Sequence, residues 1–205
     1  MLKSALPILA LLLLHCGLVE QSAVAQSPSS MIIIISKEPK GAFAFTKDWA
    51  YSSNVTKDDN GKFFKNKDGK ITSKDTAHLY FTAKCTTNVQ GGYMIRYCHA
   101  IKRAEIIELN FSDGLPAYAS EFNAFISKNK LSFKPVIIYP ELIPGQKITY
   151  KVTKSRLTLY QKNYANSKKL SGYIDVEFIE NTILKNKEEN HKYYFRGYFK
   201  TPVNV

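Results

Sequence analysis

The chain has 205 residues, long enough for one domain with a substantial core, and its formal net charge is +12. This excess of Lys and Arg favours anionic partners: acidic glycans, anionic lipid headgroups, nucleic acid or an acidic protein. The lysines are spread along the chain and form no basic block, which disfavours a dedicated nucleic-acid tract. A charge of this size also occurs on basic exported domains that bind no anion.

The first 25 residues have the pattern of a secretory signal peptide. Lys3 gives a positive start, residues 6–14 form an apolar run, and Ala23, Val24 and Ala25 form a signal-peptidase site. The run is shorter than the roughly 20 apolar residues that span a bilayer, and no comparable stretch follows, so no transmembrane segment is expected. We therefore expect cleavage after Ala25 and a single secreted or periplasmic β-rich domain over residues 26–205.

A bacterial lipoprotein is the alternative form of export. Cys16 follows Leu13, Leu14 and His15, whereas lipidation normally requires a small residue directly before the cysteine. The sequence therefore favours removal of Cys16 with the signal peptide over a lipid anchor on it.

The first half of the mature chain predicts strands separated by polar turns. Residues 26–30 are expected to be disordered, and residues 31–36 and 42–51 to form strands, the second containing Trp49. Asn-Gly and Asp-Gly turns follow between residues 58 and 70. Their spacing does not match a calcium loop, because Thr56 or Phe64 would occupy the first ligand position, where Asp is needed.

The mature chain keeps two cysteines, and their spacing predicts a disulfide. If Gly91 and Gly92 form a two-residue hairpin turn, Cys85 lies opposite Cys98 on a non-hydrogen-bonded pair, within reach of a bridge. Alternation from residue 76 places Cys85 on the core side of its strand. Two buried free thiols or a thiol–metal pair remain open as alternatives.

Residues 113–129 predict the one α-helix. Asp113 can cap it, Pro116 suits its first turn, and Asn129 lies at its end. Tyr118, Phe122, Phe125 and Ile126 fall at helical spacing, which is typical of core packing.

The remaining chain predicts strands at 132–139, 147–161, 172–179 and 192–200, with a turn at Pro144 and Gly145. Apolar parity changes within 147–161, which predicts a bulge or a strand crossing near residues 154–156. About nine short strands and one helix indicate a mainly β fold: an antiparallel β-sandwich, or a barrel-like sheet, with one mid-chain α-helix.

Catalytic and metal motifs are missing from the sequence. No nucleophile elbow, phosphate loop or metalloprotease motif occurs, and no catalytic residue, cofactor or metal site is predicted. The acid pairs Asp58 with Asp59, and Asp175 with Glu177, could serve a glycosidase. Surface carboxylates paired with nearby lysines are the simpler interpretation.

The last strand carries the candidate binding residues. Alternation places Phe195 and Phe199 inward and one polar set outward: Tyr194, Arg196, Tyr198 and Lys200. The polar face of the expected hairpin adds a second set: Tyr80, Tyr93, Tyr97 and His99. Rings beside cations bind sugars by stacking and acidic groups by charge. Tyrosine and lysine are also ordinary cross-strand partners, and in a sandwich this face could be core.

Together these features predict an exported, non-catalytic β-domain that binds an anionic or glycan partner, such as an acidic surface, at or near the cell envelope. A hydrolase of envelope glycans and a β-barrel carrier of an apolar ligand are the alternatives. The sequence does not indicate the oligomeric state.

Overall fold

The computed structural model describes residues 32–49, 55–65, 70–72, 76, 78–113, 120–139 and 143–205. The predicted signal segment 1–25, with Cys16, and the expected disordered start at 26–30 lie outside these residues, as does Tyr118. None of the described helices is long and apolar enough to cross a membrane.

The described chain is mainly β, as predicted, and one ten-stranded sheet dominates it. The order along the sheet is β1-β10-β11-β12-β6-β7-β8-β9; in addition β4 pairs with β12, and β5 pairs with β4. The strands are β1 (Ile32–Ile35), β4 (Ala83–Thr87), β5 (Tyr93–Ile95), β6 (Tyr97–Arg103), β7 (Ile106–Ser112), β8 (Glu121–Ser127), β9 (Lys130–Val136), β10 (Lys147–Leu159), β11 (Lys169–Leu184) and β12 (Lys187–Asn204). Because β9 also contacts β1 and β10, the sheet nearly closes into a barrel.

Smaller elements lie outside the main sheet. A separate hairpin pairs β2 (Val55–Lys57) with β3 (Phe63–Lys65). The named helical elements are three short 3-10 helices, η1 (Ala44–Lys47), η2 (Val89–Gly91) and η3 (Tyr164–Asn166).

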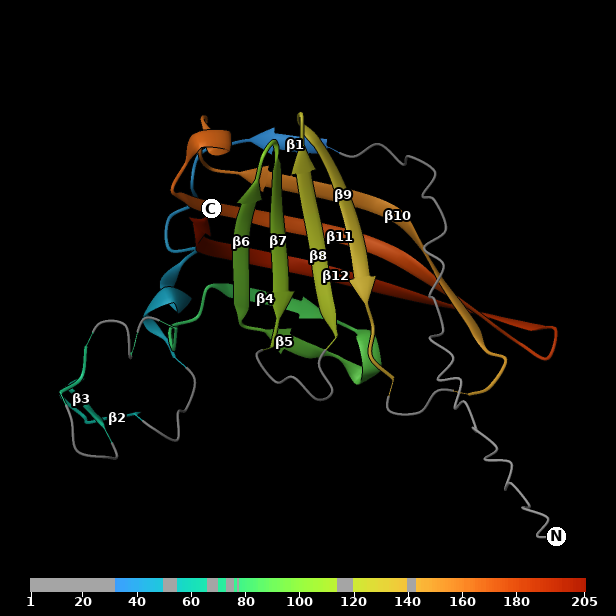
Figure 1. Ribbon diagram of the computed structural model, residues 1–205, viewed down its shortest axis with the longest axis horizontal. Coiled ribbons are helices and arrows are strands. Elements are labelled where there is room, and N and C mark those ends of the chain that lie inside the picture. Colours follow the sequence, from blue (N-terminus) through green and yellow to red (C-terminus); the bar gives the residue numbers. More distant parts are fainter. Residues whose placement is uncertain are drawn as a thin grey trace, which may run out of the picture.

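Two groups of strands cross and enclose the core between them. Figure 1 shows β6 to β9 running steeply across the long strands β10, β11 and β12. Six phenylalanines, each at most 1% exposed, fill the space between the groups: Phe111, Phe122, Phe133, Phe178, Phe195 and Phe199. Their ring centroids lie 4.5 to 6.3 Å apart, the range of favourable aromatic contact. The barrel interior is therefore packed with rings.

The helix predicted at residues 113–129 is wrong over residues 120–129, because 121–127 form strand β8, and residues 114–119 lie outside the described residues. Phe122 and Ile126 fit helical spacing, but with Ala124 they also fit alternation, and all three are buried. Lys128 and Asn129 both have positive φ, 47° and 63°, as a two-residue primed turn requires, and this turn joins β8 to β9. Asn129 thus belongs to a hairpin turn and does not end a helix.

The strand predicted at 42–51 is also wrong over its described part, which contains η1. Phe43 and Phe45 are both buried, so their alternation resembles that of a strand. Local bonds decide otherwise: the Thr46 hydroxyl donates to the Phe43 carbonyl at 2.9 Å, and the Asp48 amide donates to the Phe45 carbonyl at 3.0 Å.

The parity change in β10 comes from a β-bulge, one of the two predicted possibilities. Its register against β11 shifts between Val152 and Lys154, slightly before the predicted position. Thr153 is therefore the extra residue, and Val152 and Ser155 both remain buried.

The predicted register of the two cysteines is wrong. The connection between β4 and β5 holds η2 and not a two-residue turn, so Cys85 pairs with Ile95. Cys98 lies on β6, where it pairs with Phe111. The predicted disulfide therefore loses its basis, and both residues are free thiols with no exposed surface. Burial raises the pKa of each thiol, which disfavours the thiolate form.

Candidate functional site

The candidate site lies on the face of β10, β11 and β12 that points away from the phenylalanine core, here called the outer face. The three strands align in cross-strand rows. One row is Lys151, Ile179 and Lys192, the next is Lys154, Glu177 and Tyr194, and the third is Arg156, Asp175 and Arg196. Residues of neighbouring rows lie about 6.8 Å apart along a strand.

The predicted stripe of β12 lies on this face. Tyr194, Arg196, Tyr198 and Lys200 are all partly exposed, whereas Phe195 and Phe199 have no exposed surface. The alternation therefore separates core from surface as the sequence indicates.

Half of the stripe is covered by an earlier segment of the chain. The Phe43 ring packs edge-on against Tyr198 at 5.9 Å, and the Lys200 ammonium lies 4.7 Å from the Phe43 ring centroid. Lys200 also pairs with Glu38 at 3.2 Å. Tyr198 and Lys200 thus hold residues 38–43 on the sheet, which leaves Tyr194 and Arg196 as the accessible members of the predicted stripe.

Arg196 belongs to a quartet of two cations and two carboxylates. Its guanidinium lies 3.6 Å from Asp175 and 3.5 Å from Glu177, and Lys154 contacts the same two carboxylates at 2.7 and 3.3 Å. Hydrogen bonds to Asp175 and Glu177 raise the pKa of Lys154. Each carboxylate contacts both cations, and with two positive and two negative charges the quartet has no net charge.

Three further cations of the same rows are not neutralised. Lys151, Arg156 and Lys192 are exposed, and none forms an ion pair with another described residue. The three rows therefore hold five cations against two carboxylates, a surplus of three positive charges on one side of one sheet.

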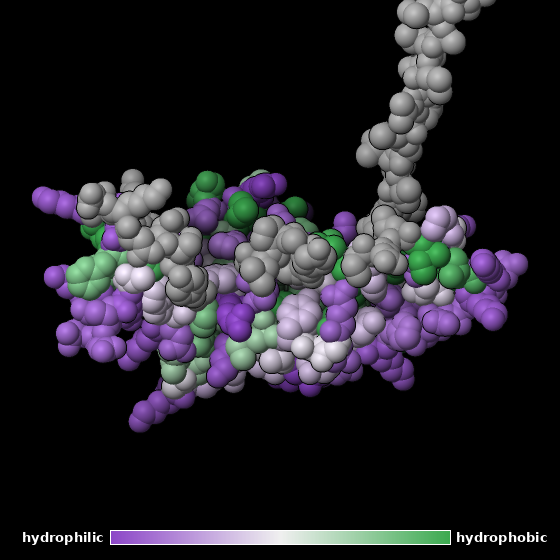
Figure 2. Space-filling view, turned by 90° about the horizontal axis from the view of Figure 1, so that it is seen from below, coloured by the Kyte–Doolittle hydropathy of each residue, from purple (hydrophilic) through white to green (hydrophobic). Residues whose placement is uncertain are grey.

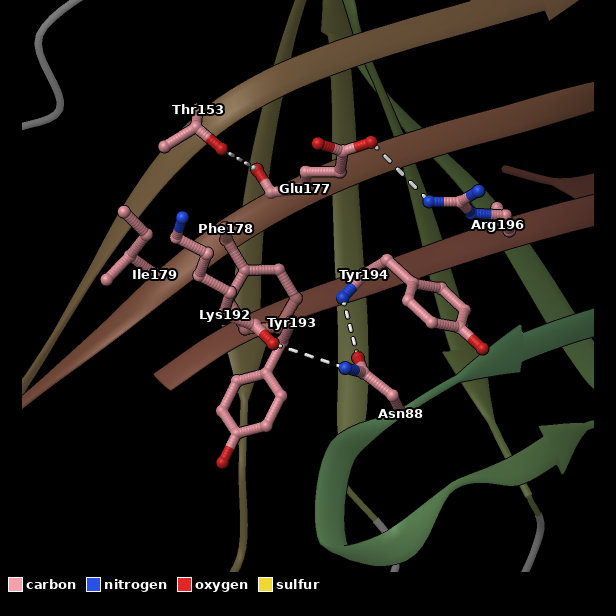
Figure 3. Close-up of a pocket in the computed structure, with 9 residues that line it drawn as sticks. All are labelled: Asn88, Thr153, Glu177, Phe178, Ile179, Lys192, Tyr193, Tyr194 and Arg196. Carbon is pink, nitrogen blue, oxygen red and sulfur yellow. Dashed lines mark hydrogen bonds and ion pairs between the residues drawn. The ribbon is translucent and has the colours of Figure 1, made fainter. Parts of the chain in front are cut away.

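A pocket of about 430 Å³ opens on this face. Figure 3 shows Thr153, Ile179 and Lys192 on one side of it and Tyr194 and Arg196 on the other. The remaining lining residues are Asn88, Glu177, Phe178 and Tyr193. The Arg196 guanidinium lies 4.4 Å from the Tyr194 ring centroid, so one face of this ring is already occupied.

Asn88 forms one wall of the pocket and completes the sheet edge. Its side-chain Nδ2 donates a hydrogen bond to the Lys192 carbonyl at 3.2 Å, and its Oδ1 accepts one from the Tyr194 backbone amide at 2.8 Å. Because β4 ends at Thr87, Asn88 takes the place of a further strand residue beside β12. It therefore fixes the backbone that presents Lys192 and Tyr194.

The other predicted binding residues lie elsewhere. Tyr80 forms an isolated bridge with Trp49 and packs against Phe63 at 6.1 Å. Tyr97, at the start of β6, packs edge-on against Phe81 at 5.9 Å. The expected register placed both tyrosines on one polar face of a single hairpin, and with that register wrong they form separate contacts.

A buried carboxylate, which sequence reasoning missed, lies on the opposite face of β11. Glu180 is 3% exposed and accepts hydrogen bonds from the hydroxyls of Tyr139 and, at 3.4 Å, Thr182. Burial and the neighbouring Glu180 raise the pKa of Tyr139, Tyr150 and Tyr193. Glu180 points to the inner face, away from the pocket, and these tyrosine hydroxyls surround it.

Sequence reasoning also missed Lys151, Ile179 and Lys192. Their grouping depends on the registers of two hairpins. The turn of Lys185 and Asn186, with φ of 49° and 63°, sets the β11–β12 register, but no glycine marks it. The bulge at Thr153 sets which β10 residues face outward.

No group of three or more His, Cys, Asp or Glu side chains able to hold a metal ion occurs among the described residues. Comparison of the chain with protein families, with curated proteins and with solved structures gives no match.

Proposed function

We propose that the chain is an exported, non-catalytic binding domain that holds an acidic glycan at or near the cell envelope on the outer face of β10, β11 and β12. The observation that carries this proposal is the surplus of positive charge in these rows: Lys151, Arg156 and Lys192 form no ion pair with a described carboxylate. Uncompensated cations on one surface attract and orient an anion.

A glycan suits this face better than a plain charged surface would. Sugars offer hydroxyls for hydrogen bonds and apolar ring faces for contact with side chains such as Ile179 and Tyr194. The pocket volume, about 430 Å³, falls in the range of small-ligand sites. Figure 2 views the molecule from below and shows hydrophilic groups over much of the visible coloured surface, with hydrophobic groups in small separate patches.

Export rests on the sequence of residues 1–25. A chain that begins at Gln26, measured by intact mass on secreted protein, would support it. A lipid-modified chain that begins at Cys16 would make the protein a membrane-anchored lipoprotein instead.

The two alternatives draw less support from the structure. A glycosidase needs two carboxylates on either side of a bound sugar, with one acting as an acid. Asp175 and Glu177 are instead ion-paired side by side on an open sheet face, and Glu180 lies on the other face. A carrier of an apolar ligand needs an internal cavity, where this barrel holds six packed phenylalanine rings.

The test is binding of the mature chain to polygalacturonate, with neutral dextran as the control polymer. The double variant Lys151→Glu with Lys192→Glu should weaken binding about 100-fold, on the basis of about 1.4 kcal/mol for each lost charge-assisted contact. The matched control is Lys130→Glu with Lys134→Glu, which makes the same charge change at exposed positions of β9. Equal loss in both variants would show that net charge alone drives binding, and absence of binding by the unmodified chain would refute the proposed function.

A further inference from the structure

The row of Lys151, Ile179 and Lys192 is unusual in this sheet because it pairs two cations across one apolar residue. Ile179 is the direct cross-strand partner of both lysines. Cross-strand partners lie about 5 Å apart at Cβ, so both flexible ammonium groups can reach the space above Ile179. Two like charges so placed repel each other unless an anion lies between them.

The carboxylates nearest to this row are already bound. Glu177, one row away, contacts Lys154 at 3.3 Å and Arg196 at 3.5 Å. Neither Lys151 nor Lys192 forms an ion pair within the described part of the chain. The row therefore provides two ammonium groups for an external anion.

The other polar groups of the pocket are mostly occupied by protein partners. Asn88 bonds the β12 backbone through both its amide nitrogen and oxygen, and the Thr153 hydroxyl donates to the Glu177 carbonyl at 3.1 Å. Arg196 is stacked on Tyr194 and paired with two carboxylates. Among the lining residues, Lys192 therefore presents the available cation, with the Ile179 side chain beside it as shown in Figure 3.

We propose that this pocket, together with Lys151 on the strand beside it, is a subsite for one carboxylate-bearing sugar residue, whose carboxylate bridges Lys151 and Lys192 while its ring lies on Ile179 beside Tyr194. This inference rests on the proposed function and narrows its ligand class from acidic glycans to uronic acid residues. A carboxylate has two oxygens and accepts one hydrogen bond from each lysine, and the sugar ring covers the apolar residue between them.

The experiment measures binding of trigalacturonate, maltotriose and inorganic sulfate to the mature chain by calorimetry. Trigalacturonate should bind, maltotriose should not, and sulfate should compete only weakly because it has no ring to place on Ile179. Lys151→Gln and Lys192→Gln should each weaken trigalacturonate binding about tenfold, the effect of about 1.4 kcal/mol. Lys134→Gln on β9 is the matched control and should leave binding unchanged.

The outcomes separate the subsite from the proposed function. If polygalacturonate binds, and Arg156→Gln weakens this binding while Lys192→Gln does not, then the outer face is still the binding surface but the proposed subsite is wrong. If sulfate displaces trigalacturonate at equal concentration, the row is a general anion site and the sugar assignment is overturned. If the unmodified chain binds no acidic polymer, the proposed function and the subsite fail together.

Discussion

The two faces of β10, β11 and β12 share one backbone but differ in what limits substitution. On the inner face Phe195 contacts the rings of Phe111, Phe122 and Phe133 at 5.9 Å or less. On the outer face its neighbour Tyr194 contacts an arginine and an open pocket. Alternation within a single strand thus separates residues needed for folding from residues available for binding.

The largest effect is expected where the inner face meets another backbone. A Cβ on Gly197 would lie 2.2 Å from the Lys84 carbonyl oxygen and 2.4 Å from the Cys85 Cα, and Gly197 has a φ of 153°. We expect Gly197→Ala to lower the free energy of unfolding by more than about 4 kcal/mol, or to prevent folding, because β4 must move off β12.

The control for that substitution is Gly145→Ala. Gly145 has a φ of 80°, but a Cβ there would meet nothing within 4 Å. Its cost should stay near 1 kcal/mol, the penalty of the left-handed backbone alone. Urea unfolding measures the free energy of unfolding of both variants. An equal loss in the two would show that β4 does not pack against Gly197 as described.

Neighbouring residues of β12 compare the two faces directly. Phe195→Ala should lower the free energy of unfolding by about 3–5 kcal/mol, because it leaves a cavity among packed rings. Tyr194→Ala should cost less than about 1 kcal/mol, because its ring contacts one guanidinium at the surface. If thermal unfolding shows Tyr194→Ala to be as costly as Phe195→Ala, the outer face is part of a core and loses its role as a binding surface.

Alkaline pH should weaken the inner face around Glu180. The pKa of Tyr139, Tyr150 and Tyr193 is raised by burial and then by Glu180, so these hydroxyls keep their protons more tightly in the folded chain. Their contribution to the free energy of unfolding is complete below the pKa of about 10 that tyrosine has in the unfolded chain. It is lost as the pH rises above that value.

Urea midpoints at pH 8, 9, 10 and 11 check this expectation. The urea midpoint of the unmodified chain should fall as the pH rises above 10. The midpoint of the Tyr150→Phe variant should fall less steeply, because the substitution removes one of these three ionising hydroxyls. The pH 8 midpoints serve as the reference, since tyrosine hydroxyls are protonated there. Identical pH dependence in both chains would contradict the raised pKa of Tyr150.

The sequence predicts local alternation well and strand register poorly. The parity of 194–199 follows from the residues themselves, since Phe195 and Phe199 alternate with polar neighbours. The β4–β5 connection could not be predicted in the same way, because Gln90 takes a φ of 50° within η2 and lengthens the loop beyond Gly91 and Gly92. Because this one turn was misplaced, Cys85 pairs with Ile95 and Cys98 pairs with Phe111, and neither is the other's cross-strand partner.

The helix error has a related cause. Phe122 and Ile126 satisfy helical and strand spacing equally, and the choice between them depends on pairing with β7 and β9. The two lysines of the proposed subsite were missed because Lys151 and Lys192 are 41 positions apart and become neighbours of Ile179 only through two strand registers. Pairings between distant strands are not contained in any local pattern.

The measurement that tests the proposed binding role of the outer face most directly is a nuclear magnetic resonance titration of the ¹⁵N-labelled chain from Gln26 onward with trigalacturonate. The largest amide shift changes should fall on Lys151, Ile179 and Lys192, with smaller changes at Tyr194 and none at Lys134 on β9. Changes concentrated around Trp49, Phe63 and Tyr80 would instead locate binding at the separate aromatic cluster and would contradict the assignment of the outer face.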